Sequence, residues 1–218
     1  MAQQALAVSR TRLWTEFAAL YIGAPLLIAL FMPGRLLFPA LALFMVAGIA
    51  LLWRTGGFDL RDLLRGWGRV PLLKLVAFGL LTALIAWAIM QVMRPDHLRP
   101  LTIERLRFLA MVWTLYPLLS ALPQELIFRP LFFHRYGTLF PDQRVMLLAN
   151  AAVFSFAHLM YWSWIVAILT FAGGLVFALS YVRRGFPSAW VFHAIAGNVL
   201  FTMGMGAYFY AGNVVRPF

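Results

Sequence analysis

The sequence predicts an all-α fold, a polytopic transmembrane helix bundle of about seven spans. Of the 218 residues, 63% are hydrophobic and only 11% are charged, whereas soluble domains carry about 25% charged residues. The apolar residues form long runs, each close to the roughly 20 residues that a helix needs to cross a bilayer. Charged residues collect in the short segments between these runs. We therefore expect one integral membrane domain covering residues 1–218.

Apolar runs define the expected spans in chain order. The first run follows Arg10 and Arg12 and has no small-residue cleavage site, so we expect it to be retained as a span. Between the second and third runs, residues 58–67 alternate apolar and charged positions at helical spacing. This pattern predicts one amphipathic helix in the membrane interface. The expected spans are residues 13–32, 36–53, 72–93, 107–134, 145–163, 164–182 and 187–210.

The Lys and Arg residues predict the orientation, because cytoplasmic loops carry an excess of both. With the N-terminus inside, eleven lie on the cytoplasmic side and six on the opposite side, which favours a cytoplasmic N-terminus. The eleven are Arg10, Arg12, Arg54, Arg61, Arg65, Arg69, Lys74, Arg135, Arg144, Arg183 and Arg184. The six are Arg35, Arg94, Arg99, Arg105, Arg107 and Arg216.

The net charge of +11 could suggest nucleic-acid binding. Because the basic residues lie in short loops between apolar runs, they are better explained as a topology signal. We therefore expect the lipid bilayer, and no nucleic acid, as a partner. Cysteine is absent, which excludes disulfides and thiolate metal sites.

Glu125 is a carboxylate placed well inside an apolar segment, in the run Pro123-Gln124-Glu125-Leu126-Ile127-Phe128-Arg129. An unpaired charge in hydrocarbon costs several kcal/mol or more. Arg129 lies four residues on, on the same helical face, and can neutralise it. Pro117, Pro123 and Pro130 each free a backbone carbonyl in this span. Together these features predict an opened helix beside a polar chamber.

Two histidines lie within later spans, His158 in Phe154-Ser155-Phe156-Ala157-His158 and His193 in span seven. A helix rises about 1.5 Å per residue. Counted from the cytoplasmic end of each expected span, this rise places Glu125, His158 and His193 in one layer of the bilayer. Asn198 follows His193 by five residues, about 140° around an ideal helix. The two share a face only if the helix is widened near Gly197. Asn198 therefore suits an interhelical hydrogen bond as well as a catalytic role.

The chain contains three motifs in order: Glu-x-x-x-Arg, Phe-x-x-x-His, and a His followed by an Asn. In this order they resemble the CAAX-protease and bacteriocin-processing family of intramembrane glutamic endopeptidases. The resemblance covers about residues 110–205, and the motif-bearing core is expected at about 107–210. It implies hydrolysis of a peptide bond in a membrane-associated protein or peptide by a water that a Glu and a His activate. Glu125 and His158 would activate the water, His193 and Asn198 would face the oxyanion, and Arg129 would pair with Glu125. The resemblance implies a bacterial inner membrane protein.

Two positions depart from the family's pattern. Gln124 stands where the family has its first Glu, as a Pro-Gln-Glu variant, and an amide cannot take a proton at neutral pH. Either Glu125 is then the base or the mechanism shifts. The expected test is Glu125→Ala, which would abolish processing in a folded, inserted protein. The second departure is the spacing from His193 to Asn198, five residues where four is usual.

Other interpretations also fit these residues. A catalytically silent relative could use the same chamber to bind a partner or lipid, as Gln124 suggests. A small proton-coupled transporter would also place Glu, Arg and His in the membrane, but no inverted repeat is seen. His158, His193 and Glu125 would form a zinc ligand set, but no His-Glu-x-x-His motif supports it. We expect no metal and no other cofactor.

Overall fold

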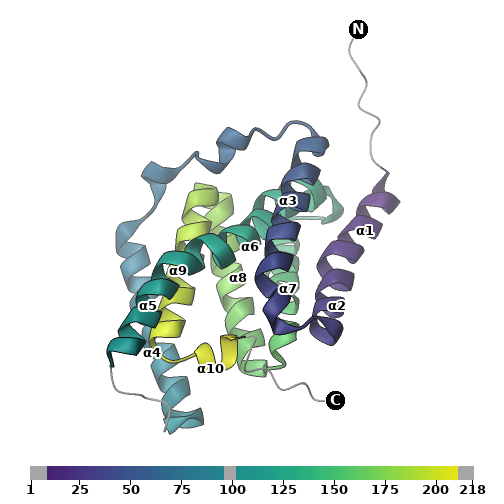
Figure 1. Ribbon diagram of the computed structural model, residues 1–218. Helices are drawn as coiled ribbons and strands as arrows, with labels where there is room; N and C mark the ends of the chain where they lie inside the picture. The colour runs from purple at the N-terminus through teal and green to yellow at the C-terminus, as the bar shows by residue number, and fades with distance from the viewer. Residues whose placement is uncertain (1–8, 96–101, 211–218) are drawn as a thin grey trace.

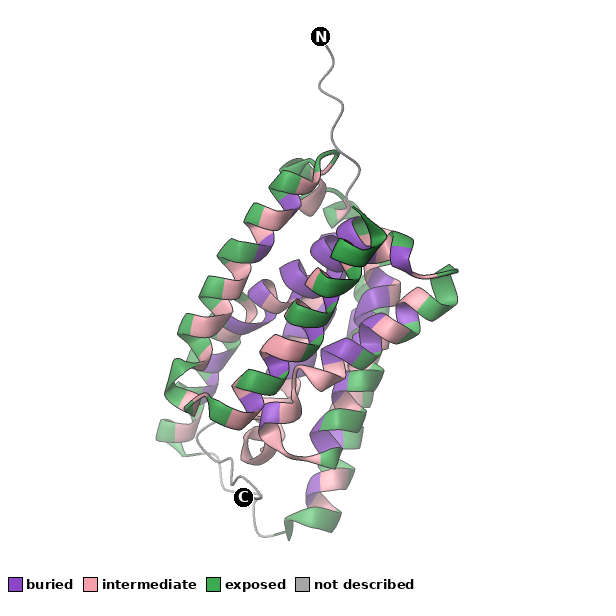
Figure 2. Ribbon diagram, turned by 90° about the vertical axis from the view of Figure 1, so that its right-hand side faces the viewer, coloured by how far each residue is buried: buried purple, intermediate pink, exposed green. Residues whose placement is uncertain are grey.

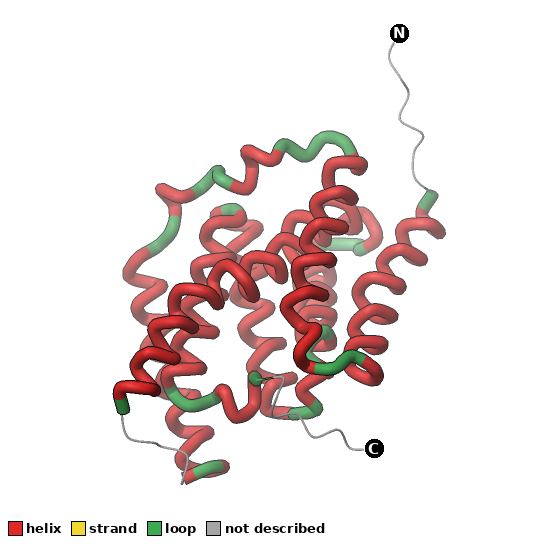
Figure 3. The backbone as a smooth tube through the Cα atoms, viewed as in Figure 1, coloured by secondary structure: helices red, strands yellow, loops and turns green. Residues whose placement is uncertain are grey.

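The computed structural model describes residues 9–95 and 102–210, and Arg99 and Arg216 of the orientation argument lie outside them. In this part of the chain every regular element is a helix and none is a strand (Figure 3). Six helices are long and apolar enough to cross a membrane: Arg10–Phe31, Gly34–Thr55, Leu72–Met93, Ile103–Leu139, Gln143–Tyr161 and Trp164–Arg184. The predicted all-α, multi-pass membrane bundle is confirmed by these six helices, and Figure 1 shows how they are arranged.

Several spans combine α-helix with tighter or wider turns. Span one contains α1 (Arg10–Ala18), a π-helical turn (Ala19–Gly23) and α2 (Ala24–Phe31). Span two is α3 (Leu37–Thr55) and span three is α4 (Leu72–Met93). Span four contains α5 (Ile103–Tyr116), a π-helical turn (Pro117–Ala121), α6 (Leu122–Leu126) and a π-helical segment (Ile127–Tyr136). Spans five and six are α7 (Gln143–Phe156) and α8 (Trp164–Arg184).

The seventh helix is shorter than the run at 187–210 predicts. Helix α9 (Phe186–Thr202) ends where Gly204 turns the chain with a φ of +87°, and the short α10 (Gly206–Phe209) follows. Seventeen residues span about 25 Å. Because α9 packs against α4, α5 and α8, most of its first turns are buried. It is therefore a core helix of the bundle.

The single amphipathic helix expected at residues 58–67 is replaced by two 3-10 turns, Leu60–Leu63 and Trp67–Arg69. Gly66 separates them with a φ of +102°, and the carbonyl of Arg184 occupies the space of a side chain there. Leu60, Leu64 and Trp67 are exposed. The segment thus keeps the apolar surface that an interfacial position requires without forming a regular helix.

The loops predicted to face the cytoplasm meet at one end of the bundle. Arg135, at the end of span four, donates hydrogen bonds to Glu16 of span one at 2.8 Å and to Thr55 of span two at 2.8 Å. His134 lies 2.9 Å from the carbonyl of Gly56. These contacts join spans one and two to the motif-bearing span. Which face of the membrane this end occupies stays a prediction.

Buried residues concentrate in α6, the following π-helical segment and α9, while the outer helices expose apolar faces (Figure 2). Trp53, Leu73 and Val92, for example, are 78–82% exposed. In water such surface would mark an interaction site. On helices long enough to cross a bilayer, it is the surface that contacts lipid.

Candidate active site

Glu125 is at the centre of a buried network of charged and polar side chains. Its carboxylate accepts hydrogen bonds from Arg129 Nε at 2.8 Å and Nη2 at 3.2 Å, and both side chains are 0% exposed. His193 Nδ1 lies 2.9 Å from Glu125 Oε1. Arg129 also donates to the side-chain oxygen of Asn150. Both carboxylate oxygens are therefore occupied, and no face of Glu125 is open to solvent.

Aromatic rings hold the His193 imidazole in place. Phe177 stacks on it with ring centroids 4.8 Å apart, and Phe154 meets it edge-on at 5.4 Å. Because a carboxylate only accepts hydrogen bonds, Nδ1 carries the proton in the bond to Glu125. The second ring nitrogen, Nε2, lies 3.1 Å from the Tyr116 hydroxyl. The network therefore continues from Glu125 through His193 to Tyr116.

Span four is widened, not interrupted, around its prolines. Two π-helical stretches flank α6, and other spans supply donors to carbonyls along them. Trp190 Nε1 donates to the Pro117 carbonyl at 2.7 Å, and the Tyr21 hydroxyl donates to the Ile127 carbonyl at 2.7 Å. Asn150 Nδ2 donates to a third carbonyl, that of Phe128, at 2.6 Å. This is how irregular backbone is tolerated at membrane depth.

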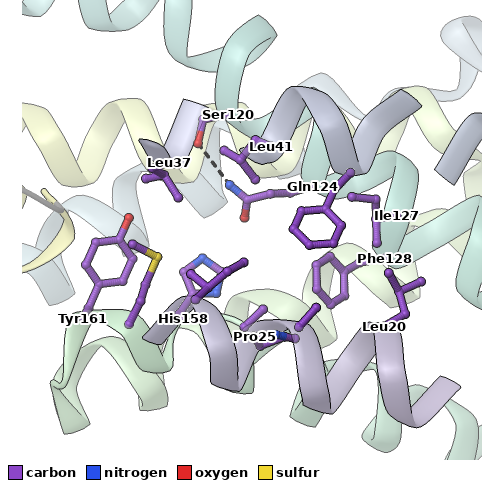
Figure 4. A pocket seen from close by; sticks show the side chains of 15 residues that line it. Leu20, Pro25, Leu37, Leu41, Ser120, Gln124, Ile127, Phe128, His158 and Tyr161 are labelled. Atoms are coloured by element: carbon purple, nitrogen blue, oxygen red, sulfur yellow. Dashed lines mark hydrogen bonds between the residues drawn. The ribbon is translucent and has the colours of Figure 1, made fainter. Parts of the chain in front are cut away.

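A pocket of about 80 Å³ lies beside this network, bounded by spans one, two and four and by the turn that follows α7. It is large enough for water, since one water needs about 10–15 Å³ of such space. Gln124 and His158 point into it from opposite sides, with Ser120 beside Gln124 (Figure 4). The apolar walls include Leu20, Pro25, Leu37, Leu41, Ile127, Phe128, Met160 and Tyr161. Spans one and two, which carry no chemical motif, thus form part of its wall.

The pocket holds two hydrogen-bonding groups of different kinds. His158 Nδ1 lies 2.7 Å from the Phe154 carbonyl, which can only accept, so Nδ1 carries the ring proton in that bond. The neutral ring then has a lone pair on Nε2. Gln124 Nε2 donates to Ser120 Oγ at 3.0 Å, and its amide oxygen points into the pocket (Figure 4). A water between the two side chains would meet two acceptors.

The structure brings some of the predicted site residues together and separates others. Glu125, Arg129 and His193 are in direct contact. Gln124 and His158 share the pocket, and the Phe154 ring lies against His158, with centroids 4.8 Å apart, as well as against His193. Glu125 and His193 do not line that pocket.

The Asn198 side chain points away from His193. Helix α9 is a regular α-helix through this region, so His193 and Asn198 do not share a face. Asn198 Nδ2 donates to the Trp113 carbonyl at 3.3 Å. Pro117, four residues after Trp113, has no N–H for that carbonyl. The amide therefore compensates for a helix bond that proline removes.

Two members of the network were missed from the sequence. Asn150 lies in the apolar run Leu147-Leu148-Ala149-Asn150-Ala151, and a polar side chain inside an apolar segment is the same signal that identifies Glu125. Tyr116 had no comparable signal, because only the packing of α5 on α9 brings its hydroxyl to His193. Among residues 9–95 and 102–210, no three His, Asp or Glu side chains come together as metal ligands.

Residues 106–209 match the family model described as type II CAAX prenyl endopeptidase Rce1-like. This segment contains the whole network and both polar sides of the pocket. The matched segment, slightly less than half of the chain, belongs to the CAAX-protease and bacteriocin-processing family. This match supports a function as an intramembrane CAAX-type protease. No curated protein and no solved structure matches the chain.

Proposed function

We propose that this protein is an intramembrane endopeptidase that hydrolyses a peptide bond of a membrane-associated protein or peptide, with His158 as general base. The observation that carries this proposal is the arrangement of Gln124 and His158 across a pocket large enough for water. A general base must be able to reach the proton that it abstracts. His158 meets this requirement, whereas Glu125 is fully enclosed.

In the proposed reaction a water donates one hydrogen bond to His158 Nε2 and the other to the Gln124 amide oxygen. His158 takes the first proton as the water oxygen attacks the peptide carbonyl. The tetrahedral intermediate then collapses, the carbon–nitrogen bond breaks, and His158 returns the proton to the leaving amine. The Phe154 carbonyl keeps Nε2 directed at the water. Gln124 positions the water without accepting its proton.

Glu125 has a different role in this mechanism from the one expected from the sequence. Since both of its oxygens accept bonds from Arg129 and His193, it holds the His193 ring and balances positive charge. The carboxylate of a catalytic triad similarly orients a histidine without taking its proton.

Cleavage of a defined probe in proteoliposomes tests the proposal. The probe is an internally quenched, farnesylated peptide ending in a CAAX sequence, and a single-span peptide with a quenched tail is used in parallel. We expect the wild type to cleave a probe and His158→Ala to be at least 100-fold slower, the scale of general base catalysis. Tyr181→Phe, whose ring packs on Phe133, is the matched control. Unchanged cleavage by His158→Ala would refute the assignment.

A second candidate is a catalytically silent relative that binds a partner or lipid in the same pocket. The observation that favours it is the amide of Gln124 facing His158, with no carboxylate lining the pocket. Gln124→Glu separates the two candidates. Cleavage that appears only in this variant supports loss of an ancestral activity, and a wild type that already cleaves supports the His158 mechanism.

We also propose that the end of the bundle carrying Arg135 faces the cytoplasm of a bacterial inner membrane, with the N-terminus on that side. Because the chain has no cysteine, single cysteines can report sidedness cleanly. A membrane-impermeant maleimide added to spheroplasts should label Gly34→Cys and leave Gly57→Cys unlabelled. The reverse pattern would invert the topology.

A further inference from the structure

Tyr116 occupies the space directly above Gly197. A Cβ added to Gly197 would overlap Cε1, Cζ and the hydroxyl of the Tyr116 ring. Gly197 lies one helical turn after His193, on the same face of α9. Only glycine at this position lets the phenol lie on α9 and reach His193 Nε2. The hydroxyl above His193 therefore comes from α5 and not from α9.

Tyr116 is also the least enclosed member of the network. Glu125, Arg129 and Asn150 are 0% exposed and His193 is 4% exposed, whereas Tyr116 is only half-buried. Along span four, Tyr116, Ser120 and Gln124 recur every four residues, and the last two line the pocket. Tyr116 itself does not line the pocket; it lies one turn before Ser120, and its hydroxyl is in contact with His193 Nε2.

We propose that Tyr116 is a catalytic residue, the hydrogen-bond donor to the oxyanion that forms when water attacks the substrate carbonyl. This inference rests on the proposed function. In the proposed mechanism His193 carries both ring protons before and throughout the reaction, donating Nδ1–H to Glu125 and Nε2–H to the Tyr116 oxygen. Tyr116 then donates its own O–H to the oxyanion, and no proton leaves the network.

The charges of the network suit this role. Glu125 contributes −1, Arg129 contributes +1 and the doubly protonated His193 contributes +1, so the network carries a net +1. The intermediate carries −1 on its oxygen. Fixed donors and charge aimed at a developing oxyanion, in a site that excludes water, are among the strongest contributions to catalysis. Asn198 cannot substitute for Tyr116 here, because its amide donates to the Trp113 carbonyl.

Tyr116→Phe is the direct test, since it keeps the ring above Gly197 and removes only the hydroxyl. We expect kcat for the farnesylated CAAX probe to fall about 100- to 1000-fold, as for loss of an oxyanion donor, with KM changed less than about twofold. Tyr181→Phe is again the control. A kcat within threefold of the wild type would overturn the proposal.

Binding of a tetrahedral analogue separates this inference from the function itself. The probe is the same peptide with a phosphonate at the scissile bond, and its Kd is compared with that of the uncleaved parent peptide. We expect the wild type to prefer the phosphonate and Tyr116→Phe to lose about 100-fold of that preference while binding the parent equally. Equal preference in both proteins, or none in the wild type, overturns the inference.

The two proposals can fail separately. If His158→Ala cleaves normally but Tyr116→Phe loses its phosphonate preference, the His158 mechanism is refuted and the oxyanion site stands. If His158→Ala is inactive while Tyr116→Phe keeps both turnover and preference, the function stands and the role of Tyr116 is refuted.

Discussion

Gln124 and Glu125 are neighbours in the sequence, yet they belong to two different environments. Glu125 is sealed in a network with Arg129 and His193, where each charge has a partner. Gln124 lines a pocket with His158, where neutral groups leave room for water. Successive residues of a helix point about 100° apart. One turn of span four therefore presents one residue to an enclosed charged network and the next residue to a pocket that can hold water.

A substitution has different consequences in the sealed network and in the pocket. In the sealed network, losing one partner leaves a charge or polar group unpaired without access to water, which costs stability. In the pocket, water can replace a lost hydrogen bond, so stability changes little and chemistry changes more. The four predictions below test this contrast.

The largest effect is expected from Glu125→Ala, which strands the Arg129 guanidinium at a position of zero exposure. Removing one partner of a buried ion pair costs about 3–5 kcal/mol. Loss of folded protein is therefore expected to accompany loss of activity, so this variant alone cannot test catalysis. Thermal unfolding in detergent measures the effect. Glu125→Gln keeps the size and one acceptor for Arg129 but removes the charge, so it should lose nearly as much stability as Glu125→Ala. Wild-type stability in Glu125→Gln would contradict the ion-pair explanation.

Asn150→Leu should have the next largest effect. The apolar replacement has a similar size but leaves a donor of Arg129 and the Phe128 carbonyl without their partner. An unsatisfied buried group costs about 1–3 kcal/mol. The same unfolding assay should show a clear fall in Tm. Wild-type stability in Asn150→Leu would indicate that water reaches Arg129.

Asn198→Leu should cost about 1 kcal/mol, the net value of one hydrogen bond, because the Trp113 carbonyl loses its donor. Pro117→Ala restores a backbone N–H that can bond this carbonyl. We therefore expect the double variant to lose less stability than the sum of the single changes. Strict additivity, measured as a double-mutant cycle, would show that Asn198 does not compensate for Pro117.

Gln124→Ala should change stability least, by about 0.5 kcal/mol, the low end of the net value of one hydrogen bond. Its bond to Ser120 borders the pocket, where water can replace it. Its effect should appear in turnover, because the water loses one of its two acceptors. Unfolding and cleavage are measured on the same preparation. A loss of stability as large as that of Asn150→Leu would remove the contrast between the two regions.

Part of the site could be predicted from local spacing. Glu125 and Arg129 pair because four residues place them on one helical face, and His193 contacts Glu125 from another helix. The predicted interfacial helix did not form as one element, since Gly66 must leave room for the Arg184 carbonyl. That carbonyl is far away in the sequence, so no local pattern indicates it.

The sequence by itself determined the class of fold and the Glu125–Arg129 pair, because hydropathy and helical period act over neighbouring residues. Only the tertiary structure decided that Gln124 faces the pocket, that Tyr116 caps His193, and that Asn198 serves the Trp113 carbonyl. Each of these depends on how one helix is rotated against another. Apolar residues that face lipid and those that face another helix look alike in a sequence, so the rotation emerges only when the bundle packs.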